Sequence, residues 1–266
     1  MVLPQSTTLG NTGVEVSTIG LGGHTFLGEY GGMARADRQE LLTIVSTALD
    51  AGINYFDVTY DEEREMFGSL VDELGIRNHL VLSAWMASAT TQTAAATVAE
   101  AERALGQLGM DHVDIFYLDW TCTPEQIEAM VSLRDRGLTR LVGVLGQGTA
   151  ESSDLSQVDA LLLNHNYHWR DREPGLRRLA ADNPDVGMIT LEPLGRGRFA
   201  QDEAEGVPAV SACLKYALAL DIAQTTLIAV RRLEHLNQNI ATWRGDLTLT
   251  DPERAALEAG KGYEDA

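Results

Sequence analysis

Cysteine is scarce in this chain of 266 residues. The two cysteines, Cys122 and Cys213, lie far apart and show none of the close spacings that metal ligands use. Neither a disulfide framework nor a zinc site is therefore predicted, and a reducing compartment is expected. We expect a cytoplasmic protein that holds no metal.

Basic charge and long apolar runs are also lacking. Lys and Arg total 20 against 39 Asp and Glu, which gives a formal net charge of -19. Nucleic acids and anionic membranes bind through basic footprints, so neither is an expected partner. No apolar run approaches about 18 residues, and the N-terminal sequence has no signal-peptide pattern. The expected partner is a small-molecule substrate, and the sequence leaves the oligomeric state open.

No linker, repeat or low-complexity segment interrupts the sequence, so one domain is expected over residues 1–266. Short apolar runs alternate with stretches of helical period, which is typical of strand-helix units around a parallel sheet. A single α/β domain of about 250 residues is usually a (β/α)8 TIM barrel, which is the predicted fold class. The eight expected strands cover residues 18–21, 55–57, 80–84, 113–118, 141–144, 160–163, 187–190 and 226–229.

Residues typical of helix ends and turns support this division. A helix over 37–52 would begin at Asp37, and one over 123–137 would begin with Thr123 and Pro124. Residues 147–159 leave room for only one or two helical turns. Residues 7–16 predict an N-terminal β-hairpin about a Gly/Asn turn, which could plug the bottom of the barrel.

The residues that end the strands are the candidates for chemistry, because barrels of this kind carry active sites on the loops after their strands. In chain order they are His24, Asp57, Trp85, Asp119, Leu145, Asn164 with His165, Glu192, and Arg231 with Arg232. Five of them carry imidazole or carboxylate groups, but their scattered positions have no metal-ligand signature, so no metal is predicted.

Several segments carry a resemblance to a known family. The segments are "STIGLGG", "INYFDVTYDEEREMFG", "HVDIFYLDW", "LVGVLG", "LLLNHNY" and "ITLEPLGRG". Over nearly the whole chain they resemble the aldo-keto reductase superfamily, whose reacting group is a tetrad of Asp, Tyr, Lys and His. Asp57 matches the family's Asp, but Trp85 stands at the Lys position and Asp119 at the His position. The resemblance therefore implies a degenerate tetrad.

The catalytic candidates follow from this comparison. Without the Lys, Asp57 lies beside Trp85 in a partly apolar pocket, and desolvation should raise its pKa and suit it to acid or base work. The alternative for Asp57 is a helix cap or an inherited remnant. Either Tyr60 or Glu62 holds the family's Tyr position, because the segment that follows is shortened. Asp119 would face Asp57 as a second acid that titrates with it, or else it caps the following turn.

The cofactor side has changed as well. The family positions that hold and stack on the nicotinamide read Leu145, Gly146, His165 and Leu191, of which only His165 could donate to an amide. Glu192 replaces a Ser that the family places against the pyrophosphate, where like charges repel. The residues that resemble the family's phosphate-binding loops are Gly195, Arg231, Arg232 and Asn239. They would bind NADP only if that cofactor is retained.

The main prediction is an enzyme that kept the barrel but lost hydride transfer. It would do lyase, dehydratase or isomerase chemistry without a cofactor on a small cyclic or polyhydroxylated substrate. The predicted catalytic residues are Asp57, Tyr60, Asp119 and His165, and the predicted substrate-binding residues are His24, Trp85, Trp120, Asn164 and Glu192. Two alternatives stay open: an NADP-dependent carbonyl reductase with an atypical tetrad, and a non-catalytic protein that binds a ligand or partner.

Overall fold

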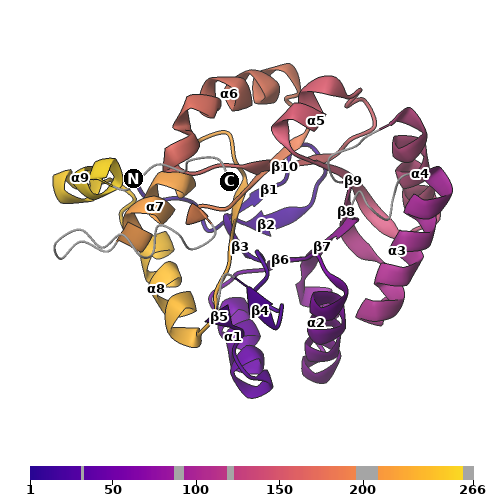
Figure 1. Cartoon of the computed structure of the whole chain (residues 1–266), viewed down its shortest axis with the longest axis horizontal. Helices are drawn as coiled ribbons and strands as arrows, with labels where there is room; N and C mark the ends of the chain where they lie inside the picture. The colour runs from indigo at the N-terminus through magenta and orange to yellow at the C-terminus, as the bar shows by residue number, and fades with distance from the viewer. Residues whose placement is uncertain (31–32, 87–92, 119–122, 196–208, 260–266) are drawn as a thin grey trace.

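Eight parallel strands close into a barrel surrounded by helices (Figure 1). The computed structural model describes residues 1–30, 33–86, 93–118, 123–195 and 209–259. Around the barrel the strands follow the order β10, β11, β12, β3, β6, β7, β8, β9. Their bounds are β3 Ile19–Leu21, β6 Tyr55–Val58, β7 Val81–Met86, β8 Val113–Leu118, β9 Thr139–Leu145, β10 Ala160–Asn164, β11 Gly187–Leu191 and β12 Thr225–Ile228. The predicted TIM barrel and its eight strands are confirmed.

The helices that cover the barrel begin and end as their capping residues require. Asp37 accepts a hydrogen bond from the Glu40 amide at the start of α1, and Thr123 forms a capping box with Gln126 at the start of α4. The bounds are α1 Arg38–Asp50, α2 Asp61–Leu74, α3 Ala94–Leu108, α4 Pro124–Asp135, α5 Gln147–Ser152, α6 Glu173–Asp182, α7 Ala209–Leu218, α8 Leu233–Arg244 and α9 Asp251–Ala259. Two 3-10 helices, η1 Arg77–His79 and η2 Tyr167–Arg172, complete the set in the described ranges.

The N-terminal hairpin closes the bottom of the barrel, as predicted. Its strands β1 (Ser6–Thr8) and β2 (Glu15–Ser17) pair antiparallel. Leu9, Val14 and Val16 of the hairpin are buried in the same cluster as the inward side chains of the barrel. The Asn11 amide donates to the Asp185 carbonyl (2.9 Å), just before β11 begins, so the hairpin lies at the amino ends of the strands. A second small hairpin, β4 (Glu29–Tyr30) and β5 (Met33–Ala34), follows β3.

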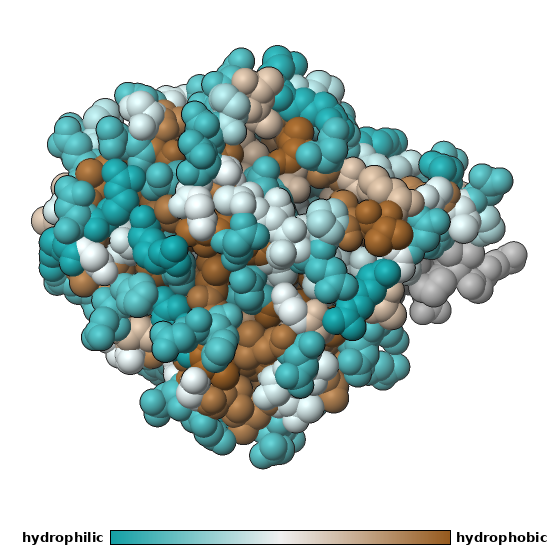
Figure 2. All heavy atoms as spheres, turned by 180° about the vertical axis from the view of Figure 1, so that it is seen from behind, coloured by the Kyte–Doolittle hydropathy of each residue, from teal (hydrophilic) through white to brown (hydrophobic). Residues whose placement is uncertain are grey.

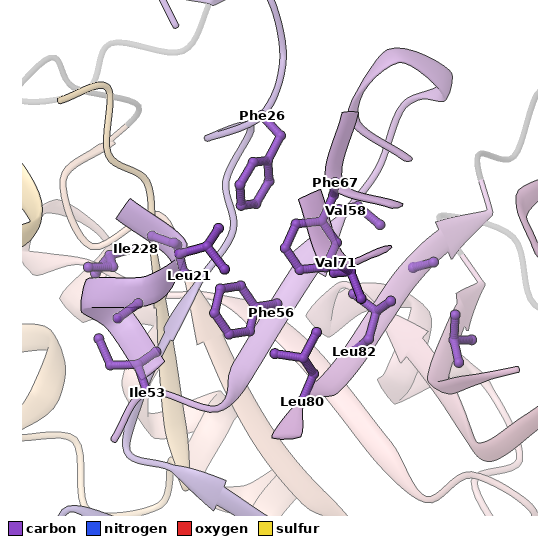
Figure 3. Close-up of a cluster of buried hydrophobic side chains, with 14 of the residues drawn as sticks. Leu21, Phe26, Ile53, Phe56, Val58, Phe67, Val71, Leu80, Leu82 and Ile228 are labelled. Atoms are coloured by element: carbon purple, nitrogen blue, oxygen red, sulfur yellow. The ribbon is translucent and has the colours of Figure 1, made fainter. Parts of the chain in front are cut away.

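Successive residues of each strand alternate between the inside of the barrel and the layer of helices. In β6, Phe56 and Val58 face outward and pack with Phe67 and Val71 of α2 (Figure 3). The rings of Phe56 and Phe67 are stacked with centroids 5.3 Å apart. Tyr55, by contrast, belongs to the cluster inside the barrel. This alternation decides which residue at each strand end can reach the mouth.

The surface of the molecule is mixed in character. Seen from behind, hydrophilic side chains cover most of the outline, and hydrophobic residues show between them toward the middle (Figure 2). Among the described residues, none of the helices has the length and apolarity that a membrane crossing requires. Cys213 is buried in α7, and Cys122 lies outside the described residues.

Candidate active site

Asp57 lies on the inward face of β6 and is only 2% exposed. Two side chains of the neighbouring strand β7 donate hydrogen bonds to it: the Ser83 hydroxyl at 2.5 Å and the Trp85 indole N–H at 3.1 Å. Both bonds end on Oδ1, so the other carboxyl oxygen, Oδ2, is the atom that can carry a proton.

Burial raises the pKa of Asp57 well above its ordinary value. The hydrogen bonds from Ser83 and Trp85 act in the opposite direction, while the nearby carboxylate of Glu63 adds to the rise. The positive charge of Arg64 also lowers this pKa, and its effect is the weakest of these. The predicted rise is confirmed, and its main cause is desolvation as expected.

No lysine of the described residues takes part in this arrangement. Trp85 occupies the inward position of β7 that the family resemblance assigns to Lys, and it packs partly buried against the barrel interior. The two lysines of the sequence are Lys215 and Lys261. Lys215 lies in α7 and pairs with Glu253 at 2.7 Å, and Lys261 lies outside the described residues. Arg64 lies outside the barrel, where it donates to the Trp85 carbonyl and to Glu100 at 2.7 Å.

Two buried tyrosines inside the barrel were missed by the sequence analysis. The Tyr55 hydroxyl donates to Ser83 Oγ at 2.9 Å and lies 3.2 Å from the Tyr117 hydroxyl. Tyr55, Ser83 and Tyr117 are all 0% exposed. Two glycines make room for the rings, because a Cβ on Gly20 would lie 2.6 Å from Tyr55 and one on Gly143 would lie 2.3 Å from Tyr117. Glycine inside two predicted strands was the signal that could have located these rings.

The structure corrects the prediction for His165. Asn164 is the last residue of β10 and shares the inward face with Leu162, whereas Leu161 and Leu163 face the helices. His165 is 1% exposed, stacks on Tyr216 of α7 and places Nε2 3.0 Å from Glu173 of α6. The His165 imidazole thus lies in the helix layer. Asn164 is the residue at this strand end that can meet a nicotinamide amide or a substrate.

The cluster around His165 pairs this buried imidazole with the half-buried carboxylate of Glu173 outside the barrel. Desolvation lowers the pKa of His165, although Glu173 opposes this shift. Burial alone would raise the pKa of Glu173, but the hydrogen bonds from Tyr216 and His165 outweigh it and lower that pKa. These three side chains join β10, α6 and α7, which indicates a structural contribution rather than the predicted catalytic one.

Tyr60 and His24 lie together at the rim. Tyr60 is the N-cap residue of α2, is 48% exposed, and stacks on the His24 ring with centroids 5.1 Å apart. His24 Nδ1 lies 3.1 Å from the buried carboxylate of Glu63, which also accepts from the Tyr60 amide. Glu62, the other candidate for the family's Tyr position, forms an exposed ion pair with Arg35 at 2.6 Å. Of the two, Tyr60 has the ring and hydroxyl that the position requires.

Two strand-end residues adopt left-handed backbone conformations that side chains rarely occupy. His24 has a φ of 68° after β3, and Glu192 has a φ of 64° after β11. The Glu192 carbonyl accepts from the Asn166 side chain at 3.2 Å and from the Gly195 amide at 3.0 Å. Such conformations cluster at functional sites, and the turn that follows β11 leads into the segment that resembles the pyrophosphate loop.

The structure also corrects the prediction for Arg231. Its guanidinium is buried and donates to the carbonyls of His24 (2.9 Å) and Leu27 (2.7 Å). Arg231 therefore holds the loop after β3 and is not open to a phosphate. Arg232 is exposed at the N-cap of α8, and its Nη1 donates to the Arg231 carbonyl at 2.6 Å. Asn239 is 3% exposed within α8, so its side chain is less open to a phosphate than that of Arg232.

Two predicted site residues, Asp119 and Trp120, lie outside the described residues. The interaction of Asp119 with Asp57 therefore stays a prediction. Within the described ranges, no three His, Cys, Asp or Glu side chains come together in a way that could hold a metal ion.

The comparison with known families decides the relationship of this chain. A model of the aldo/keto reductase family matches residues 18–210. The chain belongs to the aldo/keto reductase family. The predicted superfamily is thereby confirmed, and the eight-stranded barrel is the fold expected for this family.

Individual relatives are distant. Aldo-keto reductase YhdN of Bacillus subtilis (strain 168) is 28% identical in an alignment 203 positions long, which covers 69% of this chain and 60% of that protein. L-galactose dehydrogenase of Arabidopsis thaliana is 22% identical in an alignment 280 positions long, gaps included, which covers 88% of this chain and 86% of that protein. The structure of aldo-keto reductase AKR11C1 from Bacillus halodurans, in its holo form, has a TM-score of 0.75 at 17% identity over 98% of both chains.

Coverage and names limit what these relatives imply. This chain spans less than two thirds of the first curated relatives that it matches: 60% of YhdN and 63% of an aldo-keto reductase of Mycolicibacterium paratuberculosis. Family membership makes the chain an aldo-keto-reductase-like barrel protein. The relatives carry the names of reductases and a dehydrogenase, so the comparisons favour the oxidoreductase alternative over the predicted loss of hydride transfer.

Proposed function

We propose that this chain is an oxidoreductase that reduces a small carbonyl compound with a nicotinamide cofactor, NADPH, and uses the Asp57 carboxyl as proton donor. The observation that carries the proposal is the state of Asp57: a carboxyl buried on the inward face of a reductase barrel with its pKa raised by desolvation. Carbonyl reduction needs an acid close to the carbonyl oxygen, and a neutral carboxyl supplies one.

The residues at the end of β10 fit the nicotinamide end of such a cofactor. Asn164 pairs in register with Leu191 of β11, and Leu162 of β10 pairs with Leu145 of β9. The half-buried Asn164 amide therefore stands between two apolar strand ends. The side chains of Leu145 and Leu191 would contact the ring, and the Asn164 amide would bond its carboxamide. When bound, the cofactor supplies the hydride.

Fewer residues than the sequence predicted are available to bind the phosphate groups of the cofactor. With Arg231 held by backbone carbonyls, Arg232 is the member of this pair whose exposed guanidinium can meet a phosphate. Gly195, with a φ of 53°, closes the turn after β11, and its sequence segment resembles the family's pyrophosphate loop. We assign cofactor phosphate binding to Arg232 and not to Arg231 or Asn239.

In the proposed reaction, the proton that the carbonyl oxygen gains is the one that Asp57 loses. The O–H bond on Asp57 Oδ2 would break and its proton would pass to the carbonyl oxygen, while a bound NADPH would supply the hydride for the carbonyl carbon and so account for the two electrons of the reduction. The product is the alcohol, and Asp57 is left as a carboxylate that takes its proton back from water. The hydrogen bonds from Ser83 and Trp85 hold Oδ1 throughout this step.

The side chains at the rim of the barrel favour a small cyclic or polyhydroxylated molecule as the substrate. Trp85 offers an apolar face beside Asp57, and the stacked rings of His24 and Tyr60 provide a second aromatic surface with polar atoms. The likeness to L-galactose dehydrogenase, which is named for a sugar, is consistent with this substrate class. Protein sites often bind sugars by placing an apolar ring against the sugar face and polar groups around its hydroxyls, as an amphipathic aromatic side chain permits.

The proposal is tested by titrating the protein with NADPH while following tryptophan fluorescence, which Trp85 should report. Saturable binding that weakens in Arg232→Ala is expected. Arg178→Ala, an exposed arginine on α6, is the matched control because it removes the same charge elsewhere. Absence of binding at millimolar NADPH would overturn the oxidoreductase and leave cofactor-free acid-base chemistry at Asp57 as the function to pursue.

A further inference from the structure

A series of hydroxyl groups runs through the barrel interior and ends on Asp57. The Ser83 hydroxyl donates to Asp57 Oδ1 at 2.5 Å, and the Tyr55 hydroxyl donates to Ser83 Oγ at 2.9 Å. Because Tyr55 uses its one hydrogen for Ser83, the 3.2 Å contact with Tyr117 requires Tyr117 to donate to Tyr55. All three donors therefore point toward Asp57, and we name Tyr117, Tyr55 and Ser83 the donor chain.

The donor chain is sealed from water. Its three side chains are 0% exposed, and the glycines at positions 20 and 143 leave the space that the two rings fill. In such surroundings hydrogen bonds in series polarise one another, and a carboxylate gains more from them than it would in water. The low exposure also keeps this side of Asp57 out of contact with bulk solvent.

Among the residues that the structure describes, the other charged groups around Asp57 do not explain how its ionised form is stabilised. Glu63 of α2 raises the pKa of Asp57. Arg64 of α2 lowers this pKa, but its effect is smaller than those of the Ser83 and Trp85 hydrogen bonds. Arg64 itself pairs with Glu100 and donates to the Trp85 carbonyl outside the barrel. On β7 the partners are neutral donors, Ser83 and Trp85, and on β8 the partner in the series is Tyr117.

We propose that the donor chain, together with the Trp85 indole, replaces the missing lysine as the group that stabilises the carboxylate formed when Asp57 gives up its proton. This inference rests on the proposed function, in which Asp57 is the acid. A lysine would keep Asp57 ionised at rest, whereas neutral donors let it hold a proton and still lose it. No proton moves along the chain: each hydroxyl keeps its hydrogen, and only the Asp57 O–H bond breaks. Ser83, Tyr55 and Tyr117 are positioning residues.

The test measures protonation of Asp57 directly, without cofactor or substrate. Infrared spectra of the intact protein are recorded across a pH titration, and the spectrum of Asp57→Asn is subtracted so that the carboxyl band of Asp57 remains. Ser83→Ala should shift the midpoint of this band to higher pH, Tyr55→Phe should shift it less, and Tyr117→Phe least. Loss of one hydrogen bond to a charged group should also slow turnover by about 10- to 100-fold in Ser83→Ala.

Matched variants separate this effect from general damage. Tyr216→Phe removes a tyrosine hydroxyl that is bonded to Glu173 outside the barrel, and it should leave the Asp57 midpoint unchanged. Ser83→Cys keeps the size of the side chain with a weaker donor, and it serves if Ser83→Ala does not fold. An unchanged or lowered midpoint in Ser83→Ala, Ser83→Cys and Tyr55→Phe would overturn the proposal. A graded shift in a protein that does not bind NADPH would instead overturn only the oxidoreductase.

Discussion

The two faces of strand β6 do different work. Outward, Phe56 and Val58 pack against Phe67 and Val71 of α2 and make no polar contact with their side chains (Figure 3). Inward, Tyr55 and Asp57 join a buried hydrogen-bonded network with Ser83. One extended segment of four residues thus supplies both a hydrophobic core and a proton-carrying group, because neighbouring side chains point to opposite sides. Stability should depend mainly on the outer face and activity on the inner face.

Asp57→Asn should have the largest effect, and the effect should fall on activity. The Asn side chain keeps an acceptor oxygen for Ser83 and Trp85 but cannot donate a proton to the substrate. Loss of a general acid should lower kcat by about 100- to 10,000-fold. Steady-state kinetics with NADPH and a carbonyl substrate would measure this, and full activity in Asp57→Asn would contradict the assignment.

Phe56→Ala should have the opposite pattern. Removing a fully buried aromatic ring from the outer face should cost about 3–5 kcal/mol of unfolding free energy. Turnover per folded molecule should stay close to that of the unchanged protein, since Phe56 does not face the mouth. Urea unfolding gives the free energy, and Phe56→Leu is the milder control. A loss of turnover with unchanged stability would break the division between the two faces.

The pH dependence of protein stability should reveal the proton that Asp57 holds on the inward face of β6, and no substrate is needed for this measurement. The pKa of Asp57 is raised in the folded protein, so the folded state binds this proton more tightly than the unfolded chain. Its contribution is fully present below the ordinary Asp pKa and is lost as the pH rises from there through the folded pKa. Melting temperatures across this range should fall less in Asp57→Asn than in the unchanged protein. Parallel curves for the two proteins would contradict the raised pKa.

Substitutions of the two neighbouring arginines after β12 should have the smallest effects, and the two effects should differ in kind: one on stability and the other on NADPH binding. Arg231→Ala removes hydrogen bonds to two partly buried carbonyls and should lower the unfolding free energy by about 1–3 kcal/mol. Arg232→Ala should leave the melting temperature nearly unchanged and weaken NADPH binding instead. Thermal melts and a fluorescence titration on both variants would distinguish them, and a reversed pattern would show that Arg231 meets the phosphate.

The fold could be predicted from the sequence because its signals are local. Apolar strands, helix caps at Asp37 and Thr123, and the turn in the N-terminal hairpin each depend on a few neighbouring residues. The rise in the pKa of Asp57 was also predictable, since an acid that ends an apolar strand beside Trp85 must lose water.

The wrong predictions at the site had two causes: the face of the strand to which a side chain points, and contacts with residues far away in the sequence. His165 follows Asn164 immediately, so a shift of one residue placed the wrong side chain in the mouth. Arg231 binds carbonyls of His24 and Leu27, about two hundred residues away in sequence, and no local pattern announces such partners. The tyrosine pair was missed because Tyr55 and Tyr117 meet across three strands, although the glycines that accommodate them were visible in the sequence.

The most direct test of the central claim is the infrared carboxyl band of Asp57 at neutral pH, obtained as the difference between the unchanged protein and Asp57→Asn. The account predicts the carbonyl band of a protonated acid, because burial in the barrel disfavours the charge. A carboxylate band in its place would show that Asp57 is ionised at rest and would contradict its role as the proton donor.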